Sequence, residues 1–293
     1  MQNLFKSCLT VFSLLCLTLV TPFPLFVHAE EFPYTVGLGF EFASGTYGTG
    51  TRTESVSVPL TLAFYPNERI NLSLEIPYVY QSNGNVTSGL FSGTQGGKTM
   101  MLPTSGMGPS GVGSSAMGTG GIGGVTTGNS QQSQNGIGDI TLKGGYILVG
   151  EKELMPQIRP NLFIKFPTAD KEKALGTGEF DEGFAVEISK WLGKWNTFAE
   201  AGYTVQGKTS RLPLRNFIAY NAGVAWQVSD RFRPILFIKG ATPPADNSSS
   251  LMELRMKLKY QATSHTGIEG YVAKGITTNS PDYGSGFALY YDF

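Results

Sequence analysis

The chain has 293 residues with 22 basic and 22 acidic side chains, so its formal net charge is zero and its composition suggests no nucleic-acid partner. Glycine is abundant at 38 residues, aromatic residues make up 12%, and charged residues only 15%. This composition disfavours a helical protein and favours a β-barrel or a β-sandwich.

The first 29 residues resemble a secretory signal rather than part of a fold. Lys6 supplies a positive amino-terminal region, an apolar stretch follows, and Ala29 ends a segment that a signal peptidase would recognise before Glu30. Both cysteines, Cys8 and Cys16, lie inside this segment. The sequence therefore predicts a cleaved signal peptide (1–29), an exported domain (30–293) and no disulfide framework.

Alternation of apolar and polar residues predicts twelve β-strands after the signal. Apolar side chains recur at every second position, which places them on one face of each strand. The expected strands cover residues 34–43, 55–64, 70–81, 140–148, 158–166, 184–189, 196–206, 214–228, 231–239, 252–260, 268–276 and 283–293. The seventh strand fits least well, because Phe198 falls on its polar face.

The connections between these strands alternate in length. Those after the even-numbered strands are short, and those after the odd-numbered strands are generally longer. An even strand number with this asymmetry is typical of an antiparallel outer-membrane β-barrel of about 12 strands, with both termini in the periplasm. A soluble sandwich would also alternate, but its exposed faces would not need so many aromatic residues.

Residues 82–136 interrupt the pattern. Gly, Ser, Thr and Met dominate this segment, and Lys98 is its only charged residue. Such a composition cannot bury a core of its own, so we expect a long extracellular loop or a plug inside the barrel.

The polar parity of the strands would line the lumen of such a barrel. The residues expected there are Lys143, Arg159, Lys165, Arg215, Arg231, Arg233, Lys239, Arg255, Lys257, Lys259, Glu41, Glu75, Glu187, Glu200, Glu253 and Glu269. The positive excess around 231–239 and 255–259 could attract anionic solutes. Alternatively, these charges pair with one another and fill the lumen.

Catalysis is not expected, and no catalytic, cofactor-binding or metal-binding residue is assigned. His265 is the only histidine outside the signal, and the strand phasing places it at a periplasmic turn. Gly118–Gly123 satisfies a dinucleotide-binding pattern, but neither a βαβ unit nor an acidic residue follows.

Three motifs resemble a known family. They are the G-x-G-D sequence at 136–139, the K-x-P-T-x-D sequence at 165–170 and the L-G-T-G sequence at 175–178. They are similar to motifs of the outer-membrane transporters named for the meta-cleavage pathway of phenol degradation (the MetA-pathway of phenol degradation family), although Ala169 stands where those proteins commonly carry glycine. The resemblance is best from about residue 136 onward and implies a connection with the catabolism of aromatic compounds.

The motif residues also have purely structural interpretations. Pro167, Gly176 and Gly178 could bend the chain at the outer rim, and Asp170 and Asp181 could cap that bend or bind a cation.

The function predicted from these observations is passive uptake of small molecules, hydrophobic or aromatic compounds among them, across the outer membrane of a Gram-negative bacterium. The alternatives are a plugged structural or surface-interaction barrel and, least favoured, a lipid-modifying enzyme. The expected partners are the lipid bilayer, a small-molecule solute, and the barrel-assembly machinery, which would recognise the carboxy-terminal strand ending in Phe293.

Overall fold

The computed structural model describes residues 34–86, 132–210, 212–246 and 248–293. The predicted signal peptide and most of the 82–136 segment lie outside these residues. Among them, no helix is long and apolar enough to span a membrane.

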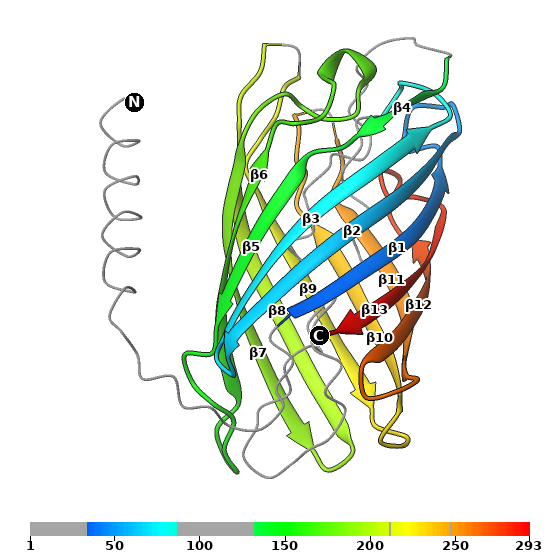
Figure 1. Ribbon diagram of the computed structural model, residues 1–293. Coiled ribbons are helices and arrows are strands. Elements are labelled where there is room, and N and C mark those ends of the chain that lie inside the picture. The colour runs from blue at the N-terminus through cyan, green and yellow to red at the C-terminus, as the bar shows by residue number, and fades with distance from the viewer. Residues whose placement is uncertain (1–33, 87–131, 211, 247) are drawn as a thin grey trace. The chain divides into compact units, whose positions relative to one another are not determined.

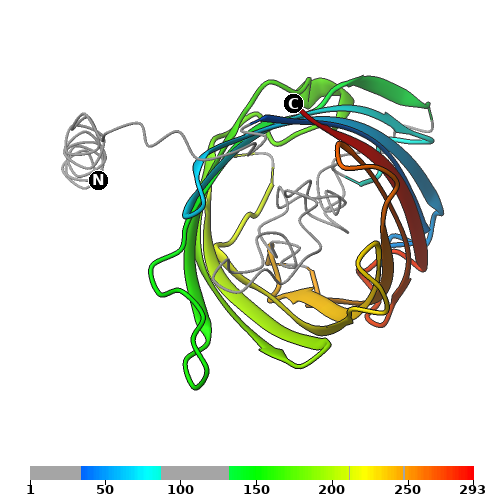
Figure 2. The same cartoon turned by 60° about the horizontal axis from the view of Figure 1, so that its bottom comes forward.

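The described chain forms one antiparallel sheet that closes on itself. Its strands are β1 (Tyr34–Gly45), β2 (Thr53–Asn67), β3 (Ile70–Gln81), β4 (Gln134–Ile137), β5 (Ile140–Tyr146), β6 (Gln157–Phe166), β7 (Asp181–Leu192), β8 (Trp195–Gln206), β9 (Phe217–Trp226), β10 (Phe232–Ala241), β11 (Leu251–Gln261), β12 (Thr266–Gly275) and β13 (Tyr283–Asp292). Each strand pairs with its neighbours, and β13 pairs with β1 through residues 35–44 and 283–292. Figure 2 shows β13 lying against β1 where the ring closes.

The barrel has twelve strand positions, because β4 and β5 pair in succession with β3. Tyr78 pairs with Ile137 and Glu75 pairs with Thr141, so two residues of β3 face three on the other strand. This is a β-bulge, and it leaves the consecutive residues Gly138 and Asp139 both buried. The fourth expected strand therefore begins earlier than Ile140, and residues 134–137 belong to the sheet rather than to the expected loop.

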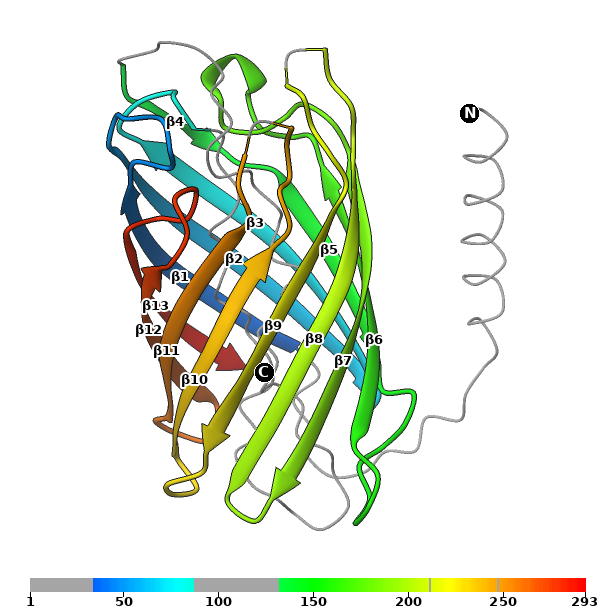
Figure 3. The same ribbon diagram turned by 180° about the vertical axis from the view of Figure 1, so that it is seen from behind.

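With one exception, the longer connections lie at one end of the barrel and the shorter ones at the other (Figures 1 and 3). We call the end carrying those after β1, β3, β6, β8, β10 and β12 the loop end, and the other the turn end. The turn after β7 is minimal, with Gly193 at φ 63°. The connection between β5 and β6 is longer than expected, because β5 ends at Tyr146 and β6 begins at Gln157.

Alternation decides which side chains face outward. One parity of each strand carries exposed apolar residues, for example Leu38, Leu72 and Leu289. The other parity carries buried residues, most of them polar. The outer surface is thus apolar and the interior polar, the reverse of a soluble protein. The predicted phase of the last strand is confirmed, with Phe287 and Tyr291 exposed.

Aromatic rings inside the barrel lie over glycines of the adjacent strand. A Cβ added at Gly183 would lie 2.3 Å from the Phe163 ring, and one at Gly286 would lie 2.3 Å from the Tyr271 ring. Glycine is therefore needed at these positions, because only a residue without a side chain lets the ring approach the wall so closely. Part of the high glycine content has this origin.

Candidate functional site: the barrel interior

Two ion pairs cross the interior face between β3 and β7. Lys143 Nζ lies 3.0 Å from Glu75 Oε2, and an Arg159 guanidinium nitrogen lies 2.7 Å from Glu187 Oε2. Each of these four side chains is at most 10% exposed. These cations are neutralised by the barrel itself.

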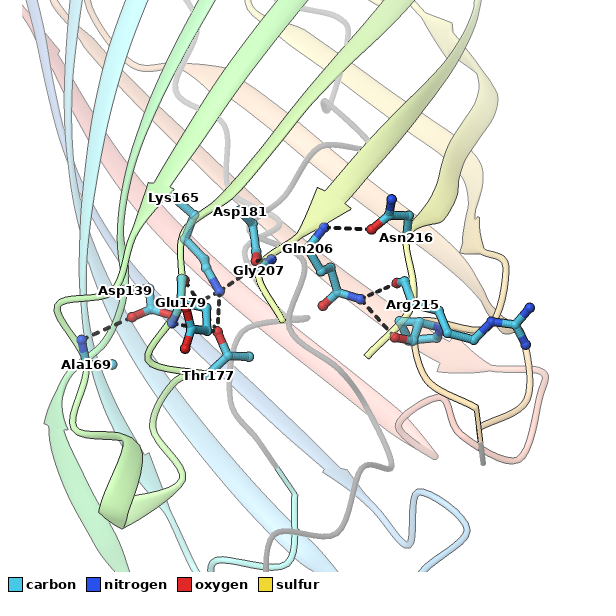
Figure 4. A network of polar contacts seen from close by, with 11 residues as sticks. Asp139, Lys165, Ala169, Thr177, Glu179, Asp181, Gln206, Gly207, Arg215 and Asn216 are labelled. Atoms are coloured by element: carbon cyan, nitrogen blue, oxygen red, sulfur yellow. Dashed lines mark hydrogen bonds and ion pairs between the residues drawn. The ribbon is translucent and has the colours of Figure 1, made fainter. Parts of the chain in front are cut away.

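A third cation, Lys165, is the centre of a polar network at the loop end, shown in Figure 4. Lys165 Nζ lies 2.7 Å from Asp181 Oδ2 and 3.1 Å from Asp139 Oδ2, and it donates to Thr177 Oγ1 at 3.2 Å. The lysine side chain is 4% exposed and that of Asp181 is fully buried. We call these four residues the rim network.

The rim network connects loops to the wall through backbone hydrogen bonds. Ala169 N donates to Asp139 Oδ1, and Gly207 N donates to Asp181 Oδ1, both at 3.0 Å. The loop between β6 and β7 and the chain that leaves β8 are thereby held against the interior. The bulge after β4 makes this possible, because it directs Asp139 inward.

The loop between β6 and β7 also buries an apolar side chain. Leu175 is 1% exposed and packs against Val79 and Ala169. A Cβ added at Gly176 would lie 2.7 Å from both carboxylate oxygens of Asp139, so no larger residue fits there without displacement. The L-G-T-G motif therefore holds the loop between β6 and β7 against the barrel wall.

Asp170 has the predicted capping role. It precedes a single 3₁₀ turn, η1 (Lys171–Lys173), and its Oδ1 accepts a hydrogen bond from Glu172 N at 2.9 Å. The turn ends at Ala174, whose φ of 56° lies in the left-handed region. Of the two predicted interpretations of the bend, the structure thus supports the structural one.

A loop residue also turns inward after β1. Tyr47 is 1% exposed and clusters with Ala43 and Val86. Burial of its hydroxyl, reinforced by the nearby negative charge of Glu253, raises the pKa of Tyr47 well above its usual value.

A second charged group lies on β11 and β12. Glu269 accepts from Lys257 Nζ at 3.0 Å and lies 3.6 Å from Lys259 Nζ. Arg255 pairs with Glu253 at 2.8 Å and stacks over the Tyr271 ring at 4.9 Å. These residues form a connected set in which the acids offset most of the positive charge.

The interior face of β10 differs from both groups. Arg233 is 4% exposed, donates from Nε to Gln227 Oε1 at 2.6 Å, and stacks over the Trp191 ring at 5.1 Å. Lys239 is half-buried on the same face. Neither side chain forms an ion pair with any residue that the structure describes.

An apolar patch lies beside these two cations. It consists of Phe198, Ala225, Ile235 and Phe237, with Trp191 packed against it. The sequence shows three signs of this patch, because Phe198 lies on the polar parity of its strand and Ile235 and Phe237 lie on that of theirs. Its importance could not be inferred there, because the partners come from three other strands. We call it the apolar wall.

The structure places the predicted lumen residues as follows. Fourteen of the sixteen lie on the inward parity of their strands and are buried or half-buried. They are Lys143, Arg159, Lys165, Arg233, Lys239, Arg255, Lys257, Lys259, Glu41, Glu75, Glu187, Glu200, Glu253 and Glu269. Glu200 accepts a hydrogen bond from Asn161 Nδ2 at 3.0 Å.

Arg215 and Arg231 do not lie inside the barrel. β9 begins at Phe217, two residues after Arg215, whose side chain is 58% exposed and faces Asp246 across 3.4 Å. Leu214, expected to begin that strand, instead turns into a small buried cluster of the loop end. Arg231 is exposed in the turn before β10.

His265 lies in the turn between β11 and β12, as predicted. Its Nδ1 is 2.9 Å from the carbonyl oxygen of Asp292, and its ring stacks on Tyr291. Within the described ranges, no group of three or more His, Cys, Asp or Glu side chains could hold a metal ion.

The sequence model of one family, described as "Putative MetA-pathway of phenol degradation", matches residues 83–293. None of the curated proteins matches the sequence.

Several solved outer-membrane barrels are similar in structure. The KdgM porin in complex with disordered oligogalacturonate has a TM-score of 0.51 at 7% identity, with 88% of this chain and 99% of that chain covered. The toluene transporter TbuX of Ralstonia pickettii has a TM-score of 0.44 at 12% identity, with 90% of each chain covered. The translocator domain of the autotransporter NalP from Neisseria meningitidis has a TM-score of 0.47 at 7% identity, with 90% of each chain covered. At such identities the likeness to the porin shows a shared fold, that of an outer-membrane β-barrel.

Proposed function

Because the chain belongs to the family described as "Putative MetA-pathway of phenol degradation", we propose that it is an outer-membrane channel for passive uptake of small molecules, aromatic compounds among them. Residues 83–293, which include all strands from β4 onward, carry the family match. The three motifs that resemble the family lie at the loop end of this region.

The observation that carries the proposal is the division between the two faces of the wall. Exposed apolar side chains cover the outside, while lysines, arginines and glutamates face the interior. A closed barrel of twelve strands is wider than the eight-stranded barrels that side chains fill. A charged interior of that width suits a narrow aqueous path.

Exposed aromatic pairs support a position across a bilayer. Trp195 and Trp226 stack at 5.6 Å near the turn end, where Tyr34 and Phe64 also stack at 5.0 Å. Tyr283 begins the last strand near the loop end and is 47% exposed. Aromatic belts at two levels are typical of barrels whose strands cross between two membrane interfaces.

The proposal includes the route to the membrane. The predicted signal peptide would export the chain to the periplasm, and the assembly machinery would recognise the last strand through Phe293. Both termini would then lie in the periplasm, with the loop end outside the cell. Replacing Phe293 with serine should reduce the fraction of protein that resists unfolding in SDS without heating, and an unchanged fraction would contradict this role.

A sealed barrel is the second candidate, and the buried ion pairs favour it. Three lysines or arginines between β3 and β7 are already neutralised by the protein. In this alternative the barrel is a scaffold, and the 82–136 segment, most of it outside the described residues, contacts partners. A lipid-modifying enzyme is the least favoured candidate, because His265 lies in a turn, where its Nδ1 is 2.9 Å from the carbonyl oxygen of Asp292.

Planar-bilayer recording of the purified protein separates the two candidates. A channel should conduct, and swelling of protein-containing liposomes should slow as the test solute becomes larger. A variant that lacks residues 92–128 provides the second measurement. Absence of conductance in both the full chain and this variant would exclude the channel and favour the sealed barrel.

A further inference from the structure

The connection between β5 and β6 is the longest at the turn end, and its tip is apolar. Lys152 N donates to the carbonyl oxygen of Met155 at 2.9 Å, and this tight turn places Leu154 and Met155 at the tip. The Leu154 side chain is 92% exposed and that of Met155 is 49% exposed. In Figure 2 the connection projects outward from the ring.

The other connections at the turn end have polar tips. Their exposed residues include Glu68, Lys194, Asp230 and Ser264. The other exposed large apolar side chains of the described chain are 36–60% exposed, and most of them lie on the outer wall, where neighbours on the sheet cover part of each. An apolar side chain as open as Leu154, beside a second one, indicates contact with something outside the protein.

The turn is held against the outer face of the barrel. Lys190 shares the outward parity of β7 with Leu192, which is 60% exposed. The Lys190 ammonium lies 3.3 Å from Glu151 Oε1 and also donates to the carbonyl oxygen of Lys152. Glu151 Oε1 accepts a further hydrogen bond from Trp191 N at 2.9 Å. We call Glu151 and Lys190 the turn clasp, and it fixes the turn outside the wall.

The turn clasp lies at the level where exposed aromatic residues gather. Lys190 is two residues from Leu192, which pairs in register with Trp195 on β8. Trp195 stacks on Trp226, with ring centroids 5.6 Å apart. Because tryptophan side chains are enriched at the headgroup level of a bilayer, the turn leaves the wall close to the headgroups.

We propose that the turn between β5 and β6 is an interfacial anchor, which inserts Leu154 and Met155 into the phospholipid leaflet at the turn end. The inference rests on the proposed position across the outer membrane, and it does not depend on transport. Apolar side chains of such anchors enter the boundary between headgroups and acyl chains by about 5–10 Å. The tip is joined to the lipid-facing wall through Leu148, which is 60% exposed, so one apolar surface extends from the strands to the tip.

Fluorescence quenching measures the depth of the tip. The protein, with Cys8→Ser and Cys16→Ser so that no other thiol remains, carries Leu154→Cys labelled with a polarity-sensitive fluorophore and is folded into phospholipid vesicles. A nitroxide lipid labelled near its headgroup should quench this probe more than one labelled near the chain end, and aqueous iodide should quench it weakly. Met155→Cys gives a second, independent position. Strong quenching by iodide with none by lipid would overturn the proposal.

Two further positions calibrate the result. Glu68→Cys, at the polar tip between β2 and β3, should be quenched by iodide and not by lipid. Leu236→Cys, on the outer face of β10 where Leu236 is 50% exposed, should be quenched by lipid. Absence of lipid quenching at Leu236 would contradict the membrane position itself, whereas lipid quenching there but not at Leu154 would contradict only the anchor. A Leu154 signal that changes with the protein-to-lipid ratio would indicate a second copy as the partner and would also overturn the proposal.

The turn clasp is tested by Glu151→Ala in the protein labelled at position 154. Loss of the carboxylate should release the turn, so lipid quenching of the probe should fall and iodide quenching should rise. Glu153→Ala is the matched control, because it removes the same charge from the same turn but lies outside the clasp. Equal changes in both variants would refute the clasp. Mobility in SDS gels with and without heating first establishes that each variant is folded.

Discussion

Replacement of Lys165 with methionine should release the loop between β6 and β7 from the barrel. The lysine ammonium lies within 3.1 Å of two carboxylates, those of Asp181 and Asp139, whose side chains are 0% and 8% exposed. Methionine fills a similar volume but leaves both negative charges buried without compensation. Breaking a buried ion pair from one side costs about 3–5 kcal/mol.

That cost sets the expected size of the effect. Without the lysine, the docked loop keeps the carboxylates of Asp139 and Asp181 buried next to each other, where they repel. Release of the loop exposes both carboxylates to water and so removes this cost. At about 1.4 kcal/mol per factor of ten, the released fraction should rise by roughly a hundredfold to a few thousandfold. Cleavage by a protease follows this fraction when opening and closing are fast.

Limited digestion with proteinase K measures the released fraction directly. Cleavage within residues 168–180 of folded protein in liposomes should be much faster for Lys165→Met than for the wild type. Lys173→Met is the matched control, because Lys173 only faces Asp170 at 4.0 Å with both side chains about half exposed. Such a pair contributes little, so its digestion should follow the wild type.

The addition of Asp181→Asn to Lys165→Met provides the decisive comparison. It removes one of the two uncompensated charges, and Asp139 keeps its hydrogen bond from Ala169 N. Digestion should therefore slow again toward the wild-type rate. Equal digestion of Lys165→Met and wild type would refute the view that this lysine holds the loop.

Three further predictions concern stability. Gly176→Ala should speed the same proteolysis, because its Cβ would lie 2.7 Å from a rim-network carboxylate, while Gly150→Ala, with nothing within 4 Å, should not. Arg159→Met should lower the free energy of unfolding in lipid vesicles by about 3–5 kcal/mol, and adding Glu187→Met should restore most of it; urea titration checks both. Trp226→Ala should cost about 0.5–1.5 kcal/mol from the lost ring stack with β8, measured by the same titration.

The strands could be predicted from the sequence because one rule governs them. Each wall residue faces either outward or inward, so apolar periodicity fixes both the strand and its phase. Twelve strand positions followed from that rule and are confirmed, and the observed pairing of β1 with β13 closes the barrel. The family suggested by the three motifs is likewise confirmed.

The features that sequence reasoning missed depend on contacts between distant residues. The bulge at Gly138 and Asp139 has no periodic signal, and it is fixed by the rim network with Lys165. Leu214 continues an alternating pattern, yet it packs against Ala245 from another loop instead of extending β9. The apolar wall joins residues of four strands. Periodicity shows Phe198, Ile235 and Phe237 as apolar residues on polar parities, but it does not show that they meet.

The positions of the motif residues also explain why the family resemblance does not name a solute. Lys165 contacts two other motif residues, Asp139 and Thr177. Gly176 has no room for a side chain, because a Cβ there would lie against Asp139. Folding constrains such residues whatever passes through the barrel, because each loss leaves a buried charge or a clash.

A solute-binding surface has the opposite requirement, since its charges must remain available when the barrel is empty. The interior charges of the motifs do not meet it, because Lys165 and Asp139 pair with each other across 3.1 Å. The search for the solute therefore belongs to the inward faces of strands that the three motifs do not include.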